Sequence, residues 1–274
     1  MNIRRRVLSL GLALGIASVA GGILIAENLV AQESQEEFKP IEGQAGRDVV
    51  WVPTPYTTVE KMLDMAKVTA KDYVIDLGSG DGRNVIAAAK RGATAVGFEF
   101  NPKMVTLSRQ NAAKAGVSDK ATFVEGDMYE ADISKASVMA MFLLTENLNK
   151  LAPKFVNLRP GTRIVINGFG IDGWTPDETD RASDCGSWCT VHLFYVPAKV
   201  DGTWSTPQGD LTIKQSFQKF TGTLASNGKQ LEIKDGLLRG TQISFTAGGT
   251  KYAGTVNGNE ITGSAPSAWK ATKK

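Results

Sequence analysis

The sequence predicts an α/β domain built on a mainly parallel sheet, followed by a smaller C-terminal domain that forms an antiparallel β-meander. Short apolar runs alternate with helical patterns between residues 51 and 198, and a glycine-rich turn follows the first complete run. After Pro197 the helical periodicity ends and turn pairs such as Asn227-Gly228 recur. With 274 residues, 42% hydrophobic and 22% charged, the chain is long enough for both domains.

The N-terminal residues 1–31 predict a signal peptide or a membrane anchor. Three arginines, Arg4 to Arg6, precede the stretch Val7–Ala26, whose 20 residues carry no charge and are enough to span a bilayer. The positive-inside rule then places the remainder outside the cytoplasm, in the periplasm or cell envelope. Residues 32–50 are polar and acidic at their start, and we expect a linker there.

The residues that open the α/β domain, Trp51 to Thr57, read W-V-P-T-P-Y-T and lead into a helical pattern. A capping-box spacing between Thr57 and Glu60 predicts that this helix begins at Thr57. Two interpretations of the proline-rich stretch stay open. It forms a rigid turn, or it forms a lid over a bound ligand with Pro53, Thr54 and Tyr56.

The stretch Tyr73–Asn84, Y-V-I-D-L-G-S-G-D-G-R-N, predicts a buried strand, a glycine-rich turn and the start of a helix. A turn with few side chains lets a ligand lie against the backbone, beside the unpaired N–H groups of the helix. Two carboxylates, Asp76 and Asp81, would repel a pyrophosphate and attract a cationic ligand. The predicted ligand-binding residues of this turn are Asp76, Gly78, Ser79, Gly80, Asp81 and Gly82.

Acidic residues also end the next two predicted strands. Glu99 follows Asp76 by 23 residues, which is the usual separation for an acid that binds ribose hydroxyls in α/β nucleotide folds. Asp127 and Met128 end the third predicted strand. Because the carboxyl ends of parallel strands share one edge of the sheet, we expect these residues to line a common ligand site.

The pattern D-x-G-x-G-x-G resembles motif I of the class I S-adenosylmethionine-dependent methyltransferases. The resemblance implies a Rossmann-like sheet, S-adenosylmethionine as cofactor, and an adenine contact at Asp127 and Met128. The V-P-T-P stretch before D-L-G-S-G-D-G-R, at residues 52–55 and 76–83, is similar to the ATP synthase c-subunit lysine methyltransferases and their bacterial relatives. That similarity covers about residues 51–174 and implies a protein lysine as methyl acceptor.

The acceptor side of the site is predicted at Thr145, Glu146 and Asn147, which end the apolar fourth strand. The c-subunit family reads more like L-L-P there, so a small-molecule amine, hydroxyl or thiol stays open as the acceptor. A third alternative is a non-catalytic, degenerate fold whose β domain binds the envelope. A lysine acceptor must lose its proton, and an apolar channel favours that loss. The candidate walls of such a channel are Trp51, Tyr56, Phe169 and Trp174.

Several expectations concern the rest of the chain. The net charge of +3 favours neither DNA nor RNA as a partner. Cys185 and Cys189 have no zinc-site spacing, which predicts a local disulfide in an oxidising compartment or two reduced thiols in the cytoplasm. His192 alternates within a strand pattern and is expected to be structural. We expect no metal.

The C-terminal residues 199–274 predict about six short strands, either open or curled toward a barrel, with residues 270–274 as a frayed tail. Their role is either stabilising or substrate- and envelope-binding. Export of the chain conflicts with a cofactor that is made in the cytoplasm. Twin-arginine export of the loaded protein, or an anchor that faces the cytoplasm, would remove that conflict.

Overall fold

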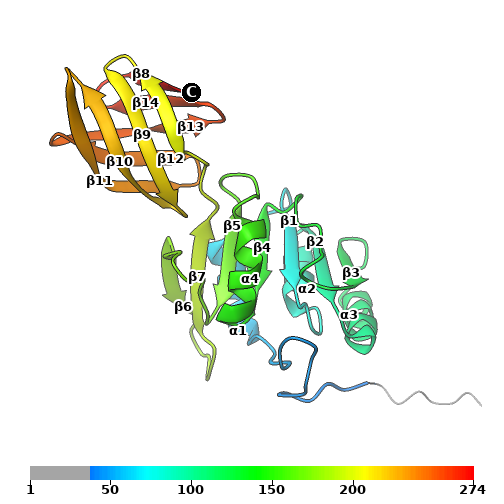
Figure 1. The fold of residues 1–274 in the computed structure, drawn as a ribbon. Coiled ribbons are helices and arrows are strands. Elements are labelled where there is room, and N and C mark those ends of the chain that lie inside the picture. Colours follow the sequence, from blue (N-terminus) through cyan, green and yellow to red (C-terminus); the bar gives the residue numbers. More distant parts are fainter. Residues whose placement is uncertain (1–37) are drawn as a thin grey trace, which may run out of the picture. The chain divides into compact units, whose positions relative to one another are not determined.

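The computed structural model describes residues 38–274, so the predicted signal peptide or anchor at residues 1–31 lies outside the described part of the chain (Figure 1). Among the described residues, no helix has both the length and the apolar character needed to cross a bilayer.

A seven-stranded sheet forms the first domain, with the strand order β3-β2-β1-β4-β5-β7-β6 (Figure 1). The strands from β3 to β5 pair in parallel, and β7 and β6 are antiparallel additions. This order confirms the predicted Rossmann-like sheet. Its strands are β1 (Tyr73–Leu77), β2 (Thr94–Glu99), β3 (Ala121–Glu125), β4 (Val138–Met141), β5 (Arg163–Asn167), β6 (Glu178–Arg181) and β7 (Thr190–Tyr195).

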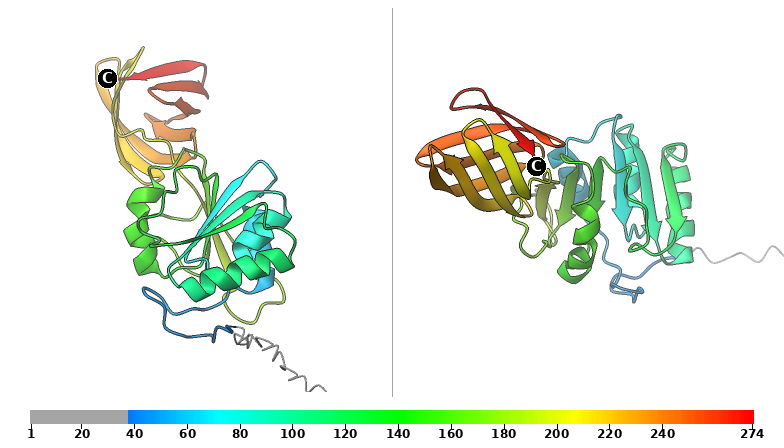
Figure 2. Two further views of the ribbon diagram at one scale, coloured as in Figure 1. Left: turned by 90° about the vertical axis from the view of Figure 1, so that its right-hand side faces the viewer. Right: turned by 45° about the horizontal axis from the view of Figure 1, so that its top comes forward.

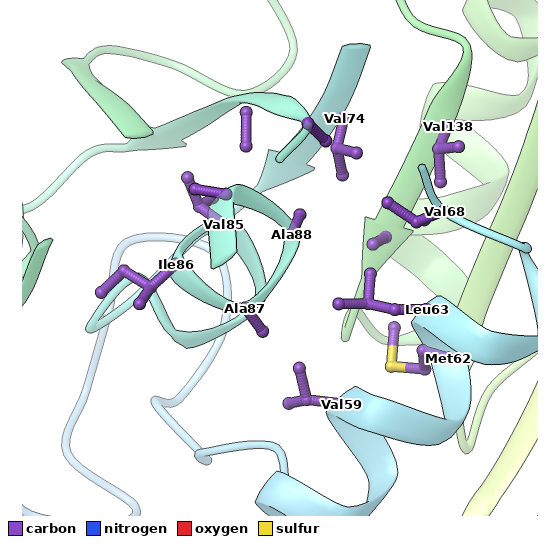
Figure 3. Close-up of a cluster of buried hydrophobic side chains, with 14 of the residues drawn as sticks. Val59, Met62, Leu63, Val68, Val74, Val85, Ile86, Ala87, Ala88 and Val138 are labelled. Carbon is purple, nitrogen blue, oxygen red and sulfur yellow. The ribbon is translucent and has the colours of Figure 1, made fainter. Parts of the chain in front are cut away.

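Helices cover both faces of this sheet (Figure 2). One hydrophobic cluster joins one face of the sheet to α1, α2 and α3, and Figure 3 shows Val59, Met62 and Leu63 of α1 near Val85 and Ala88 of α2. A second cluster joins the other face to α4. The helices are α1 (Tyr56–Met65), α2 (Arg83–Lys90), α3 (Pro102–Lys114) and α4 (Thr145–Phe155).

The helix starts follow local chemistry, with one difference from the sequence prediction. The Asn101 side chain accepts a bond from Lys103 N at 3.0 Å, and Pro102 takes the first position of α3, where it loses no helical hydrogen bond. Helix α1 starts at Tyr56, after Pro55 and without a side-chain cap. The predicted start at Thr57 was therefore wrong by one residue.

Eight antiparallel strands form the second domain, a closed barrel in the order β10-β11-β12-β13-β14-β15-β8-β9 (Figure 1). Alternate side chains fill its interior, including Trp204, Phe220 and Phe245. The prediction of an antiparallel meander is confirmed, but the strands are eight and the sheet is closed. The strands are β8 (Gly202–Thr206), β9 (Gly209–Ser216), β10 (Lys219–Ser226), β11 (Lys229–Arg239), β12 (Gln242–Ala247), β13 (Thr250–Asn257), β14 (Glu260–Ala265) and β15 (Trp269–Lys273).

The predicted frayed tail was wrong, because most of it belongs to β15. This strand pairs with β14 on one side and with β8 on the other, and so completes the barrel. The buried Trp269 anchors it by packing against Phe245 and Tyr252 and by donating from its indole N–H to Ala265 O at 2.8 Å. Of the lysines that suggested a solvated end, Lys270 points outward from the strand, whereas Lys273 is half-buried on the face of Trp269, with its Nζ 5.5 Å from the centre of the Trp204 ring.

Candidate functional site

The glycine-rich turn lies at the carboxyl edge of the sheet, between β1 and α2. Gly78 N and Ser79 N donate to Phe98 O at 2.8 and 3.0 Å, which ties the turn to β2. Gly80 has a φ of +55°, and a Cβ atom there would lie 2.7 Å from the indole Nε1 of Trp51. The turn therefore needs glycine both for its backbone conformation and for the approach of Trp51.

The other residues predicted in this turn have separate places. Gly82, with a φ of +84°, precedes α2 and packs against the ring of Phe123. Ser79 is buried, and its Oγ atom has no hydrogen-bond partner within residues 38–274. Gly78 lines the cleft described below.

Glu99 closes the turn from the end of β2. Its two carboxylate oxygens accept from Gly80 N and Asn101 N, both at 2.9 Å. The carboxylate thus lies at the turn and lines the same cleft as Gly78, as the sequence predicted.

Asp76 is buried at the end of β1, and its Oδ2 accepts from Asn84 Nδ2 at 3.1 Å. Its other oxygen has no partner among the described residues. Burial raises the pKa of Asp76 well above the usual carboxyl value, the charges of Glu99 and Asp81 raise it further, and the Asn84 bond opposes the shift. A cation beside this carboxyl would favour its ionised form.

Neither Asp76 nor Asp81 is among the residues that line the cleft with Gly78 and Glu99. Asp81 forms a two-pronged ion pair with Arg83, whose Nε lies 2.9 Å from Asp81 Oδ1, and Arg83 Nη1 donates to Thr54 O at 2.7 Å. The exposed Tyr56 ring lies 4.9 Å from the Arg83 guanidinium. Arg83 thus ties three predicted ligand residues together on the outer side of the turn, and Tyr56 and Asp81 line a separate surface depression there.

A cleft runs along the turn, and we call it the glycine-loop cleft. Residues 44–52 form one wall, tied back on themselves by bonds between Gly43 N and Trp51 O and between Trp51 N and Gln44 O. Part of the predicted linker at residues 32–50 is thus a structured wall of this cleft. The lining residues are 44–52, Gly78, 98–101, Met104, Gly126, Met128 and Phe142.

Arg47 belongs to that wall and contacts residues that follow the ends of β2 and β3. Its Nη1 lies 2.9 Å from Asp127 Oδ2, and its guanidinium lies 4.4 Å from the centre of the Phe100 ring. The buried Met128 lines the cleft next to Asp127. Sequence reasoning missed Arg47 and Phe100, because an isolated arginine in a polar stretch carries no signal of the acid that it will meet.

These residues fit an S-adenosylmethionine molecule by three observations. The turn leaves its backbone bare where a Cβ would collide with Trp51. Asp76, buried behind the turn, keeps one oxygen without a partner among the described residues, and such an oxygen can still accept a bond from a ligand. Glu99 presents a carboxylate at the edge where ribose hydroxyls bind in such sheets.

An apolar pocket adjoins this cleft and shares four lining residues with it, Val49, Val50, Val52 and Phe142. We call it the aromatic pocket. The rings of Phe142, Phe169 and Trp188 touch one another there, with centroid distances between 5.3 and 6.0 Å. Its lining is Val49, Val50, Val52, Phe142, Leu143, Leu144, Phe169 and Trp188.

Of the four aromatic residues predicted as channel walls, Phe169 lines this pocket. Trp51 covers Gly80 instead, and Trp174 is buried against Phe194 and Phe217. Sequence reasoning missed Phe142, which lies inside an apolar run that reads as core. It left Trp188 unassigned, although its position between two cysteines marks a constrained loop.

The predicted acceptor residues Thr145, Glu146 and Asn147 form the first turn of α4, just beyond the aromatic pocket. Glu146 is exposed and pairs with Lys150 at 3.3 Å. Asn147 is buried and donates to Tyr129 Oη at 2.8 Å. The structure thus gives Glu146 and Asn147 partners within the domain and places the preceding Leu143 and Leu144 in the pocket.

The remaining candidate groups have structural partners. Cys185 and Cys189 form a local disulfide, which is the first of the two predicted alternatives. His192 Nδ1 lies 2.9 Å from Thr179 Oγ1 on the neighbouring strand, and burial lowers its pKa. This supports the prediction of a structural histidine.

Comparison with known proteins matches the sheet domain to methyltransferases. A family model described as the ANTKMT methyltransferase domain matches residues 76–178. A protein-lysine N-methyltransferase from Saccharolobus islandicus is 44% identical over 151 residues, which cover 54% of this chain and 94% of that protein. An ATP synthase c-subunit lysine N-methyltransferase from Mus musculus is 35% identical over 217 residues, covering 78% and 83% of the two chains.

A solved structure extends the likeness to three dimensions. It is described as an RNA methyltransferase from Salinibacter ruber in complex with S-adenosyl-L-homocysteine. The two chains are 42% identical with a TM-score of 0.51, and the match covers 54% of this chain and 96% of that one. The bound S-adenosyl-L-homocysteine is the demethylated product of the predicted cofactor.

Proposed function

Because this chain belongs to the class I S-adenosylmethionine-dependent methyltransferases, in the family of the protein-lysine and ATP synthase c-subunit lysine N-methyltransferases, we propose that it methylates a lysine side chain of a protein. The observation that carries the acceptor class is the likeness to the protein-lysine N-methyltransferase, which extends over nearly the whole of that relative. The glycine-loop cleft and the adjoining apolar pocket provide the matching geometry.

Residues of the turn and the cleft would each contact a different part of the cofactor, according to their charge and polarity. Bound S-adenosylmethionine supplies a methyl group on a positively charged sulfonium, which a neutral amine can displace. Asp76 would face positive charge of the cofactor, Glu99 would accept from its ribose hydroxyls, and Met128 would contact its adenine. Glu99 is already held in place by Gly80 N and Asn101 N. Such preorganisation reduces the entropic cost of binding.

The chain contributes to the reaction mainly by position and by excluding water. A lysine amine attacks only when it is neutral, and an apolar surrounding disfavours the ammonium form. Holding that amine in line with the transferable methyl group supplies most of the acceleration in a direct displacement. The aromatic pocket lies beside the cleft, where such an amine would enter.

A second acceptor class has its own support. The Salinibacter relative is described as an RNA methyltransferase. Against an RNA acceptor stand the low net charge of +3 and an apolar pocket whose described lining residues carry no charge. A small-molecule amine is a third possible acceptor, and it would need no surface on which a substrate protein could dock.

One experiment separates these acceptors. The purified full chain is incubated with S-adenosylmethionine labelled on its methyl group and an extract of the source cells, divided into protein, RNA and small-molecule fractions. We expect label in the protein fraction, recovered as methyllysine after acid hydrolysis. The Glu99→Ala variant, run beside it, should incorporate far less label. Label confined to the RNA or the small-molecule fraction, or no transfer with a bound cofactor, contradicts the proposal.

We also propose that the N-terminal segment exports or anchors the enzyme. The support is its three arginines ahead of 20 uncharged residues, together with a disulfide pairing that is typical of oxidising compartments. A reporter fused after Lys274 tests this. Reporter activity outside the cytoplasm is the expected result, and activity confined to the cytoplasm overturns it.

A further inference from the structure

One side of the aromatic pocket is formed by Trp188, which comes from a different part of the chain from Phe142 and Phe169. Phe142 and Phe169 follow the carboxyl ends of β4 and β5, so the central sheet positions them. Trp188 comes from the loop between β6 and β7 and closes the ring cluster at 5.3 Å from Phe142 and 5.4 Å from Phe169. It is 41% exposed and borders solvent, whereas Phe142 and Phe169 are half-buried.

Three local features hold Trp188 in that place. The Cys185–Cys189 disulfide closes the loop around it, and its own φ of +56° turns the backbone sharply. Thr58, fully buried on α1, donates from its Oγ1 to Trp188 O at 3.1 Å. At Gly168 a Cβ atom would lie 3.2 Å from the indole Cε3, so the missing side chain leaves room for the ring.

The pocket suits one kind of occupant. Its described lining residues are uncharged, and it is continuous with the glycine-loop cleft through Val49, Val50, Val52 and Phe142. At its rim Val50, Leu144 and Trp188 are 54%, 43% and 41% exposed, which gives an apolar entrance. A lysine side chain matches this shape, because it has a long apolar stem and an amine that reacts only after losing its proton.

We propose that Trp188, held by the Cys185–Cys189 loop, is the outer wall of the acceptor channel and determines how well a lysine is bound and deprotonated there. This inference rests on the proposed lysine methylation. Phe142 and Phe169 form the inner wall, and Trp188 excludes water from the entering amine. The disulfide is a positioning element for Trp188 and takes no part in the transfer.

The first test compares Trp188→Ala, Trp188→Phe and the unchanged full chain, with the protein fraction of a cell extract as acceptor and methyllysine as readout. Trp188→Ala should lower kcat/KM for the acceptor about tenfold or more, and Trp188→Phe should restore most of it. The affinity for S-adenosylhomocysteine, measured by calorimetry, should change less than about twofold in both. Leu237→Ala is the matched control, because this barrel side chain is similarly exposed at 44%.

The second readout is the pH profile, which a purely structural role would not move. Opening the wall hydrates the acceptor ammonium, so the pH at which the rate rises should be higher in Trp188→Ala than in the unchanged chain. Arg47, Asp48 and Glu99 line the adjoining cleft, Glu146 follows the pocket residue Leu144, and Asp184 lies in the loop that carries Trp188. These variants leave all five charged groups in place.

The third test addresses the disulfide. Replacing both cysteines by serine should lower kcat/KM in the same direction as Trp188→Ala and add little when combined with it, since both changes act through one side chain.

Each outcome has a separate meaning. An unchanged kcat/KM in Trp188→Ala, or an equal loss of cofactor affinity, overturns the channel assignment while the proposed function stands. Unchanged kinetics in the double serine variant overturns the positioning role of the disulfide. No methyllysine from the unchanged chain contradicts the proposed function, and the channel assignment with it.

Discussion

At the residue scale, Asp76 is buried and one of its oxygens has no partner among residues 38–274, so this side chain lowers the stability of the ligand-free protein. The surrounding apolar packing and the neighbouring acids raise its pKa in the folded state. The unfolded chain ionises this carboxyl near pH 4, so the folded state loses relative stability as pH rises from there to the raised folded pKa. Above the folded pKa the loss is constant.

We therefore expect Asp76→Asn to raise the free energy of unfolding of the ligand-free protein at pH 8. The asparagine removes the buried acid and can keep a bond to Asn84. The advantage over the unchanged chain should shrink as the pH falls from about 8 toward 4. Urea unfolding at several pH values measures it, and a variant that is less stable at every pH would refute the assignment. The same variant should bind S-adenosylmethionine more weakly.

Glu99 gives the second prediction at this scale, since both of its carboxylate oxygens are engaged at the turn. Glu99→Ala should weaken S-adenosylmethionine binding by about 2–4 kcal/mol, because charge-assisted bonds to the ribose and the turn are lost. Glu125→Ala is the matched control, because Glu125 pairs with Glu99 in register on the neighbouring strand and is exposed. Calorimetric titration checks both, and equal affinities would show that Glu99 does not bind the cofactor.

At the element scale, the glycine-rich turn and the wall formed by residues 44–52 depend on each other through one contact. Gly80 has positive φ and lies directly under the Trp51 indole. Gly116 also has positive φ, at +71°, but no atom lies within 4 Å of a Cβ placed there. The pair therefore separates backbone strain from loss of the Trp51 contact.

We expect Gly80→Ala and Gly116→Ala to lower the free energy of unfolding, each by about 1–3 kcal/mol from backbone strain. Gly80→Ala should in addition weaken cofactor binding at least about tenfold, because Trp51 and its wall must move. Thermal unfolding and calorimetric titration provide the two measurements. Equal cofactor affinity in the two variants would show that the wall does not support the cleft.

The sequence predicted the elements near the glycine-rich turn well, because each signal there is local in the chain. The strand into Gly78 and the acid at Glu99 follow from spacing alone. The partners of Asp81 and Asp127 did not follow from it. Arg83 is two residues from Asp81, but its guanidinium also donates to Thr54 O, 29 residues earlier in the chain. Arg47 pairs with Asp127 across 80 residues of chain. Such pairings depend on the tertiary fold, which no short window contains.

At the scale of the whole molecule, the sheet domain and the barrel bury separate hydrophobic clusters. They are linked by specific contacts, including the stacked rings of Trp174 and Phe217 at 4.9 Å, the bond from Gln218 to Thr175 O, and the ion pair of Arg239 with Glu178. Separate cores of this kind often unfold in separate steps.

We therefore expect two transitions in calorimetry of the purified chain. S-adenosylhomocysteine at 100 times its dissociation constant should stabilise the sheet domain by about 2.7 kcal/mol and raise its Tm by roughly 5–10 °C. The barrel transition should stay where it is. In Glu99→Ala the ligand-induced shift should be much smaller at the same concentration. A single transition that moves as a whole would show that the two domains unfold together.

The sequence predicted the barrel less completely than the sheet domain. Turn pairs and alternating side chains revealed antiparallel strands, but closure depends on β15 meeting β8, about 70 residues earlier in the chain. The lysines near the C-terminus obscured that strand, because Trp269 and Ala271 are its only buried residues and Lys273 shares their face.

The closed ring of the second domain also matters for how the molecule behaves in a crowded solution. A ring leaves no seam where a foreign strand could attach, so the strand edges of the described chain are those of β3 and β6 in the open sheet. The β6 edge consists of four exposed residues, three of them charged. Addition of a foreign strand at the β6 edge is therefore discouraged by its charges.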